Sequence, residues 1–158
     1  MRTAGLHPSS RLVSTGAIEA DEALADKFGG CCRCSLLRMQ RVRLIEGEPA
    51  SIETAHVNLS LCPSLPDHDF ECESLYDVLL KEGGVRVEHG REHISISRLN
   101  AEEAELLQQE EGTPVFYEST IEFDKDMRFV EHCKSVILPT KFRFADNGEK
   151  ERHEERGR

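Results

Sequence analysis

The same order of predicted elements occurs twice along this chain, and this repetition limits the possible folds more than any single motif does. In each half, a strand is followed by a short acid-rich helix and then by a hairpin of two strands. The two helices carry the related strings ADEA at Ala20–Ala23 and AEEA at Ala101–Ala104. A shift of 78 residues lays the first hairpin on the second without a gap and brings Glu53 onto Glu131. The alternative is two unrelated hairpins that follow two unrelated helices.

Hydrophobic periodicity, helix caps and glycine stops give the bounds of the elements. We expect strands at residues 10–18, 35–44, 50–59, 86–99, 113–123 and 127–138, and helices at residues 20–28, 74–81 and 100–109. Strands joined by tight turns run antiparallel, so the two halves should pair into one antiparallel sheet with helices packed against it. The predicted fold class is therefore α+β.

The charge of the chain limits its partners. The 158 residues carry a formal net charge of -10. A protein that binds the DNA backbone presents cationic side chains to it, so this chain is not expected to contact DNA itself. A small anionic ligand is compatible with the charge, because a pocket responds to local charge. No apolar run reaches the length of a membrane span and no signal peptide is recognisable, so we expect a cytoplasmic protein without a membrane partner.

The six cysteines do not form a recognisable metal motif. Cys31, Cys32 and Cys34 are clustered, but no second pair follows at the spacing that zinc sites use. A chain of this length can build a core without disulfides. We therefore expect reduced thiols, no metal and no cofactor.

Four residues have the character of a phosphate site. Arg41 and Arg43 lie two apart in the strand RVR, so their side chains share a face and suit a dianionic group. Ser74 begins the short helix of ESLYDVLL, where unpaired N–H groups favour an anion, and Tyr76 adds a hydroxyl. Each residue also has an ordinary structural role open to it: a solvated strand face for the arginines, a helix cap for Ser74 and a core position for Tyr76.

Two carboxylates lie inside apolar strand runs. Glu53 is in SIETAHV and Glu131 is in FVEHCKSV, and such carboxylates need a cation or a ligand hydroxyl as partner. No nucleophile–base pair, phosphate-binding GK[ST] loop or H-E-x-x-H accompanies them, so an enzyme is not expected. Four histidines also lack metal-ligand spacing: His56, His89, His93 and His132.

These residues stand in strings that resemble a known family. RVRLIEGEPASIETAHVNLSLCPSL resembles the second and third strands of the effector domain, called UTRA, of HutC-type regulators in the GntR superfamily. HPSSRLVSTGAIEADEALADKFG resembles the opening segment of that domain. The strings SLYDVLL, AEEAELL, GTPVFYESTIEFDKDMRFVEHCKSV and KFRF follow in the family's order. The resemblance extends over residues 4–144.

The resemblance implies a chorismate-lyase-like fold, an antiparallel sheet with short helices built from two pseudo-repeated halves. It implies an effector-binding domain at residues 1–144. The tail at residues 145–158 is almost entirely charged or small, so from its composition we expect it to be disordered. In such repressors a separate winged helix-turn-helix domain, absent from this chain, binds DNA as a homodimer. Our sequence-based candidates for an apolar dimer patch are Ile94, Ile96, Phe116 and Phe129.

The resemblance also assigns ligand-binding roles. Family members that sense phosphorylated sugars bind the phosphate through R-x-R and S-x-Y elements, which match Arg41, Arg43, Ser74 and Tyr76. Glu53 and Glu131 match the carboxylates that hold sugar hydroxyls or the amide. Ile137 stands where the amino-sugar repressors have an aromatic residue. Two alternatives stay open: an enzyme of the chorismate-lyase type, and a dimerisation module with a degenerate pocket.

Overall fold

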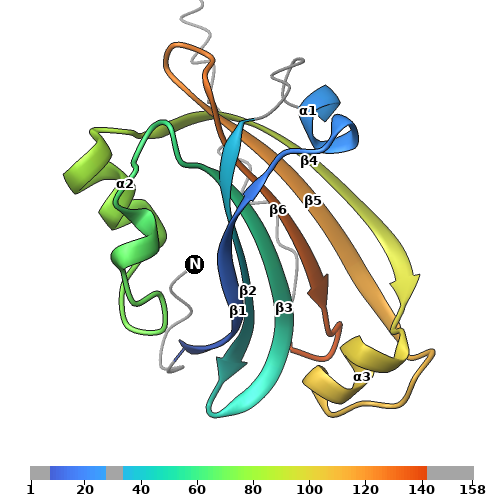
Figure 1. Ribbon diagram of the computed structural model, residues 1–158. Helices are drawn as coiled ribbons and strands as arrows, with labels where there is room; N and C mark the ends of the chain where they lie inside the picture. The colour runs from blue at the N-terminus through green and yellow to red at the C-terminus, as the bar shows by residue number, and fades with distance from the viewer. Residues whose placement is uncertain (1–7, 28–33, 142–158) are drawn as a thin grey trace, which may run out of the picture.

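The computed structural model describes residues 8–27 and 34–141, whose strands form one six-stranded antiparallel sheet (Figure 1). The strands are β1 (Pro8–Glu19), β2 (Ser35–Ile45), β3 (Glu48–Asn58), β4 (Val87–Arg98), β5 (Pro114–Asp124) and β6 (Phe129–Ile137). The helices are α1 (Glu22–Lys27), α2 (Leu75–Gly83) and α3 (Ala101–Leu107), with a short 3-10 turn η1 (Leu65–Asp67) before α2. The α+β class and the antiparallel sheet are confirmed.

The two predicted halves lie side by side in this sheet. Its strand order is β1-β2-β3-β6-β5-β4, so each half contributes three strands and the halves meet where β3 pairs with β6. On these strands Glu53 lies opposite Ser135, and Val57 lies opposite Glu131. A shift of 78 residues converts one pair into the other, as an approximate two-fold axis requires.

The gap-free overlay of the two hairpins is wrong in detail. Arg41 faces Glu53 in the first hairpin, and a gap-free shift would place Ser119 opposite Glu131. Glu122 faces Glu131 instead, and the register shifts again directly after Glu122. The second hairpin differs because its turn is longer and is built around the buried carboxylate of Asp124.

Asp124 organises that turn through its side chain. Its Oδ1 accepts hydrogen bonds from the backbone N–H groups of Asp126 and Arg128, at 2.9 and 2.8 Å. Its Oδ2 accepts one from Arg128 Nε at 2.7 Å. An aspartate that satisfies successive turn N–H groups is a common device of tight turns. It also sets where β6 begins relative to β5.

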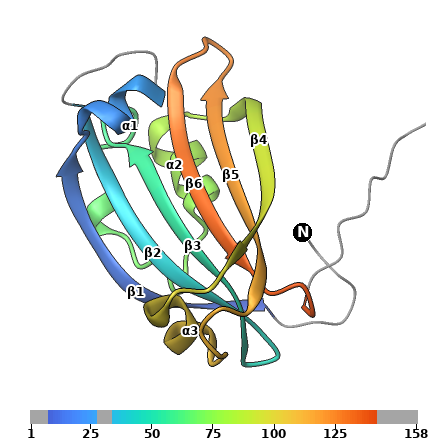
Figure 2. The same cartoon turned by 90° about the vertical axis from the view of Figure 1, so that its right-hand side faces the viewer.

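The two faces of the sheet are covered differently. One, here called the α2 face, packs against η1 and α2 through buried residues such as Leu37, Met39 and Val57. On the other, the α1–α3 face, α3 covers Val42, Ile52 and Val136 at one end. At the opposite end of this face, Ala20, Leu36 and Phe129 form a smaller cluster. Figure 2 shows α1 and α3 in front of the sheet and α2 behind it.

Local sequence signals explain the helix ends. Asn100 caps α3: its side chain accepts from the backbone N–H of Glu103, whose carboxylate accepts in return from the N–H of Asn100. Such a reciprocal capping box satisfies two otherwise unpaired donors. Ser74 caps α2, and Gly84 ends it at a φ of 63°, which glycine adopts without strain.

Several expectations can be compared with the described residues. Phe129 is buried in the core, so its candidacy for a dimer patch is wrong, whereas Ile94 and Ile96 on the edge strand β4 are exposed. Cys34 is disulfide-bonded, which corrects the expectation of reduced thiols at that position, while Cys62, Cys72 and Cys133 are free. The predictions for Cys31, Cys32 and the tail at residues 145–158 fall outside the described ranges.

Candidate ligand-binding site

The predicted arginines lie on the α2 face, not on an outer solvated surface. Arg41 and Arg43 on β2 flank Glu53 on the neighbouring strand β3. Arg41 Nη2 donates to Glu53 Oε2 at 3.1 Å, and Arg43 Nε lies 3.7 Å from Glu53 Oε1. The Arg41 side chain is 11% exposed and that of Arg43 is 36% exposed. Arg43 also donates to the hydroxyl of Ser10 on β1. Three of the predicted residues thus form one charged cluster.

Tyr76 and Glu131 form a second cluster. The Tyr76 hydroxyl, carried by the first turn of α2, lies 2.5 Å from Glu131 Oε2 and 2.8 Å from Glu122 Oε2. A hydroxyl has one proton and can donate to only one of the two carboxyl groups. The Tyr76 hydroxyl therefore donates to one of the two carboxyl groups at a time.

The carboxyl of Glu131 is partly protonated near neutral pH. Burial, together with the charges of Glu122 and Glu53, raises the pKa of Glu131 to about 7. The Tyr76 hydrogen bond and the Arg41 charge act in the opposite direction. Burial, followed by the Glu131 charge, also raises the pKa of Tyr76, which keeps its proton.

The two clusters lie within electrostatic reach of each other. The carboxyl of Glu131 responds to Glu53 and to Arg41, both on the other half of the sheet. Cys133 lies between them on β6, and burial followed by the charges of Glu131 and Glu53 raises the pKa of its thiol. The α2 face therefore carries a cationic end at β2 and an acidic end at β5 and β6.

Two acids at the acidic end, Glu118 and Glu122, were not predicted from the sequence. Glu122 shares the Tyr76 hydroxyl. Glu118 lies opposite Ser135, which in turn lies opposite Glu53. Burial raises the pKa of Glu118 to about 7, as does its hydrogen bond with Glu92. Glu118 and Glu122 lie four residues apart on one strand, so the sequence alone indicates that they share a face. Only the register between β5 and β6 shows that Glu131 lies on the same face.

Ser74 is separate from these clusters. It is exposed at the start of α2, where its Oγ accepts from the backbone N–H of Asp77 at 3.4 Å. It borders an open hollow of about 290 Å³ with Cys72, Asp77 and Lys81 among its neighbours. Within the described part of the chain, Ser74 forms hydrogen bonds with its own helix and not with Arg41 or Arg43. Convergence of all four residues on one anion stays a prediction.

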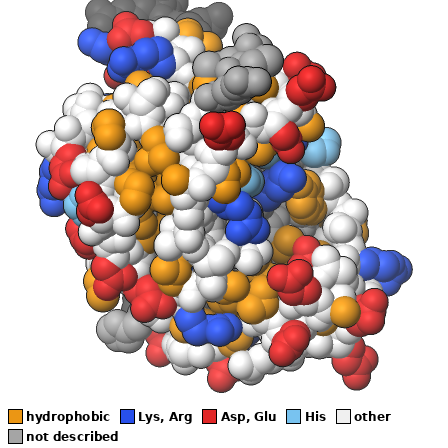
Figure 3. Space-filling view, viewed as in Figure 1, with side chains coloured by type: hydrophobic (Ala, Val, Ile, Leu, Met, Phe, Trp, Pro, Cys, Tyr) orange, Lys and Arg blue, Asp and Glu red, His pale blue; other side chains and the backbone are white. Residues whose placement is uncertain are grey.

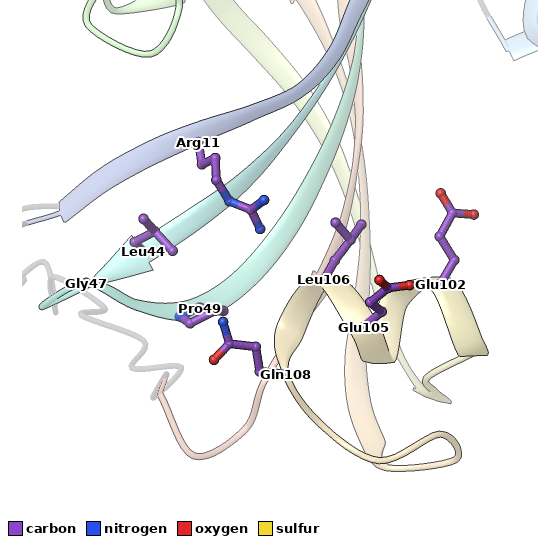
Figure 4. Close-up of a pocket in the computed structure, with 8 residues that line it drawn as sticks. All are labelled: Arg11, Leu44, Gly47, Pro49, Glu102, Glu105, Leu106 and Gln108. Atoms are coloured by element: carbon purple, nitrogen blue, oxygen red, sulfur yellow. The ribbon is translucent and has the colours of Figure 1, made fainter.

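A second hollow, of about 610 Å³, lies between α3 and the β2–β3 hairpin (Figure 4). It is lined by Arg11, Leu44, Gly47, Pro49, Glu102, Glu105, Leu106 and Gln108. None of the six predicted ligand-binding residues borders it. In the described part of the chain, no group of three or more His, Cys, Asp or Glu side chains is placed to hold a metal ion.

Comparison with known proteins agrees with this architecture. The chain is 28% identical to the HTH-type transcriptional repressor NagR of Bacillus subtilis, over 91% of its own length and 59% of that protein. It is 25% identical to the HTH-type transcriptional repressor PhnF of Mycolicibacterium smegmatis, over 89% of its length and 57% of that protein. The chain thus spans less than two thirds of the curated relatives that it matches.

Solved structures show the same fold. The crystal structure of the PhnF effector domain from Mycobacterium smegmatis superposes with a TM-score of 0.82 at 26% identity, covering 89% of this chain and 86% of that one. A possible transcriptional regulator, YydK of Bacillus subtilis, superposes with a TM-score of 0.81 at 19% identity, over 87% of this chain and 60% of that one, and shows the fold alone.

Fold and relatives together define a class, the effector domains of GntR-family transcription regulators. Within that class, the chain belongs to the UTRA domain family, whose model matches residues 3–143. The sequence-based resemblance is confirmed. None of the described helices is both long and apolar enough to cross a bilayer.

Proposed function

We propose that this domain senses a phosphorylated sugar or a related anionic metabolite on its α2 face, and that the ligand controls operator binding by a separate helix-turn-helix domain. The observation that carries the proposal is the position of Arg41. The Arg41 side chain is only 11% exposed and lies beside Glu53 on the face that α2 covers, whereas arginine side chains are mostly exposed in folded proteins.

Arg41 and Arg43 are the proposed phosphate-binding groups. Both already contact a carboxylate, Glu53, whose two oxygens occupy positions that phosphate oxygens could take. Glu53 would then turn to the sugar hydroxyls. Ser74, with the N-terminus of α2, is proposed to approach the phosphate from the opposite side, since helix starts favour anions.

Glu131 and Tyr76 are the proposed contacts for the uncharged part of the ligand. A buried carboxyl and a hydroxyl can each donate or accept, so they suit neutral hydroxyl or amide groups of a sugar. Ile137, opposite Phe116 on β5, offers an apolar contact in place of an aromatic ring.

The relatives support a regulatory role and not catalysis. NagR and PhnF are HTH-type transcriptional repressors, and by analogy we propose that this chain acts as a non-enzymatic, cytoplasmic homodimer. The acidic net charge of -10 fits a domain that leaves DNA contact to another part of the protein.

A thermal-shift screen tests the function. Its arms are N-acetylglucosamine 6-phosphate, glucose 6-phosphate, the free sugars, aromatic acids and fatty acids. A ligand at 100 times its Kd should stabilise the fold by about 2.7 kcal/mol. Stabilisation by phosphosugars alone supports the proposal. Stabilisation by aromatic acids alone, with turnover, would instead support an enzyme of the chorismate-lyase type, and no response in any arm would support a degenerate pocket.

A further inference from the structure

The middle of the α1–α3 face is polar, although apolar clusters lie on either side of it. One cluster lies near α1 and the other lies under α3, and no described helix crosses the strip between them (Figure 2). The strip contains Ser14, Arg38, Gln40, Thr54, His56, Ser119, His132 and Lys134. These residues point away from the site proposed above, because strand neighbours alternate between faces.

Strand register brings the strip's cations and histidines together. Arg38 on β2 lies opposite His56 on β3, which lies opposite His132 on β6. In the next row, Thr54 on β3 lies opposite Lys134. Arg38 and Lys134 therefore stand on the two strands that flank β3, with His56 between them. Figure 3 shows Lys or Arg side chains beside histidine near the middle of this view, between α1 and α3.

Among the described residues, neither Arg38 nor Lys134 forms an ion pair. Arg38 Nη1 donates to Ser14 Oγ at 3.1 Å. The ion pairs of the described residues involve Arg41, Arg43, His68 and Arg128, and none involves Arg38 or Lys134. Both side chains are only partly exposed. The chain has 30 acidic and 20 basic residues, so two half-buried cations that have no carboxylate partner in the described part of the chain require an explanation.

His56 supplies an independent observation. It is 7% exposed, yet no hydrogen-bond partner of its Nδ1 atom lies among the described residues. Buried polar atoms in native proteins are nearly always paired, so an unpaired one indicates a missing partner. Burial, then the charges of Arg38 and Lys134, lowers the pKa of His56. A hydrogen bond with the backbone of His132 raises that pKa, but burial and the two cations outweigh it, so the ring is neutral near pH 7. Asp21 is the acid whose charge reaches it.

We propose that Arg38, Lys134 and His56 form a second ligand site, which binds a small oxyanion such as a phosphate or carboxylate group on the α1–α3 face. The guanidinium and the ammonium supply the charge, and the His56 ring lies between them and lines the site. The hydroxyls of Ser14 and Thr54 stand in the same strip and add hydrogen bonds. The site lies on the opposite side of the sheet from Arg41, and it holds whether or not the α2 face binds a phosphosugar.

Histidine NMR tests the site, with inorganic phosphate as the probe. The full chain is labelled at the histidine rings and titrated with phosphate, while ionic strength is held constant with sodium chloride. The His56 ring resonance should shift saturably. The apparent Kd should rise at least tenfold in Arg38→Gln and in Lys134→Gln. The apparent Kd should stay within twofold of the parent in Arg41→Gln, which removes a proposed phosphate contact of the α2 face. It should also stay within twofold in Arg91→Gln, which replaces an exposed arginine of β4.

The two glutamine variants lie on different strands, so the loss of one variant to misfolding leaves the other as the test. Absence of a saturable shift at His56 would overturn the proposal. So would an unchanged Kd in the variant that folds, or a loss of the shift in Arg41→Gln. Failure of phosphosugars in the thermal screen, with the His56 response intact, would refute the function of the α2 face and leave this second site standing.

Discussion

Ala55 and Cys133 lie directly opposite each other on the central strands β3 and β6, and they are 78 residues apart in the sequence. The same interval separates Glu53 from Glu131. The approximate two-fold axis that relates the halves therefore passes between Ala55 and Cys133, with one glutamate on each side. Glu53 faces arginines, whereas Glu131 faces Tyr76 and Glu122. A symmetric framework thus carries a cationic end and an acidic end on one face.

Replacement of Arg41 tests the phosphate end. Arg41→Ala should weaken binding of N-acetylglucosamine 6-phosphate by about 1.5–3 kcal/mol, since a charge-assisted contact is lost. The free energy of unfolding should fall by only about 1 kcal/mol, because Arg43 stays beside Glu53. Calorimetry at fixed salt measures the first quantity and denaturant unfolding the second. Arg91→Ala is the control, and equal affinities in both variants would rule out a phosphate contact at Arg41.

Two variants of Ser74 distinguish its role as the helix cap of α2 from its proposed contact with an anion. Ser74→Asp keeps a good helix cap but adds a negative charge, so it should fold normally and lose phosphosugar affinity at least tenfold. Ser74→Ala should instead lose about 1 kcal/mol of stability. Binding of the Asp variant at parental strength would show that Ser74 serves α2 only.

Glu131 should make stability depend on pH. Its pKa is about 7 in the fold against an ordinary 4.5, so the stabilisation is complete below pH 4.5 and is lost as the pH rises toward 7. Glu131→Gln cannot ionise, and relative to the parent it should gain about 1–3 kcal/mol between pH 5 and pH 8. Urea unfolding at both pH values measures this difference. The exposed Glu102→Gln should show no such change.

Gly83 should tolerate no side chain. An added Cβ would lie 2.8 Å from the backbone oxygen of Leu61 and 3.1 Å from Cys62 Cβ. Gly83→Ala should therefore destabilise the fold by about 1–3 kcal/mol, since the segment before α2 must move. Gly16→Ala is the matched control, because nothing lies within 4 Å of its Cβ position. Equal melting temperatures for the two variants would contradict the packing of α2 described above.

The edge strand β4 should mediate a homodimer. Within residues 8–27 and 34–141 no strand pairs with its outer edge, and Ile96 is 79% exposed. Such edges are usually paired or covered. Light scattering at micromolar concentration should give twice the 17.9 kDa mass of one chain. Ile96→Glu should give the monomer, with Val13→Glu on the opposite edge strand as a control. A parental mass of one chain that does not change on concentration would show the prediction wrong.

Elements with strong local signals were predictable from the sequence. The Asn100 cap and the glycine stop after Lys81 fixed α3 and α2 to within two residues. The pairing of Arg41 with Arg43 was visible because residues two apart share a strand face. Glu118 and Glu122 were not assigned to the site, since their neighbours depend on the register between β5 and β6. That register depends on Asp124, whose buried carboxylate accepts two backbone and one side-chain hydrogen bond in the turn. The periodicity of the sequence does not reveal these contacts.

Tyr76 has one hydroxyl proton to share between Glu122 and Glu131. A ligand that binds here therefore also affects the protonation of these carboxyl groups. A ligand group that takes the place of the tyrosine hydroxyl changes the surroundings of both carboxyls and with them the pKa of Glu131. Occupancy of the sensor and the acidity of its surroundings become linked variables. The same metabolite concentration would therefore give different degrees of saturation at different pH.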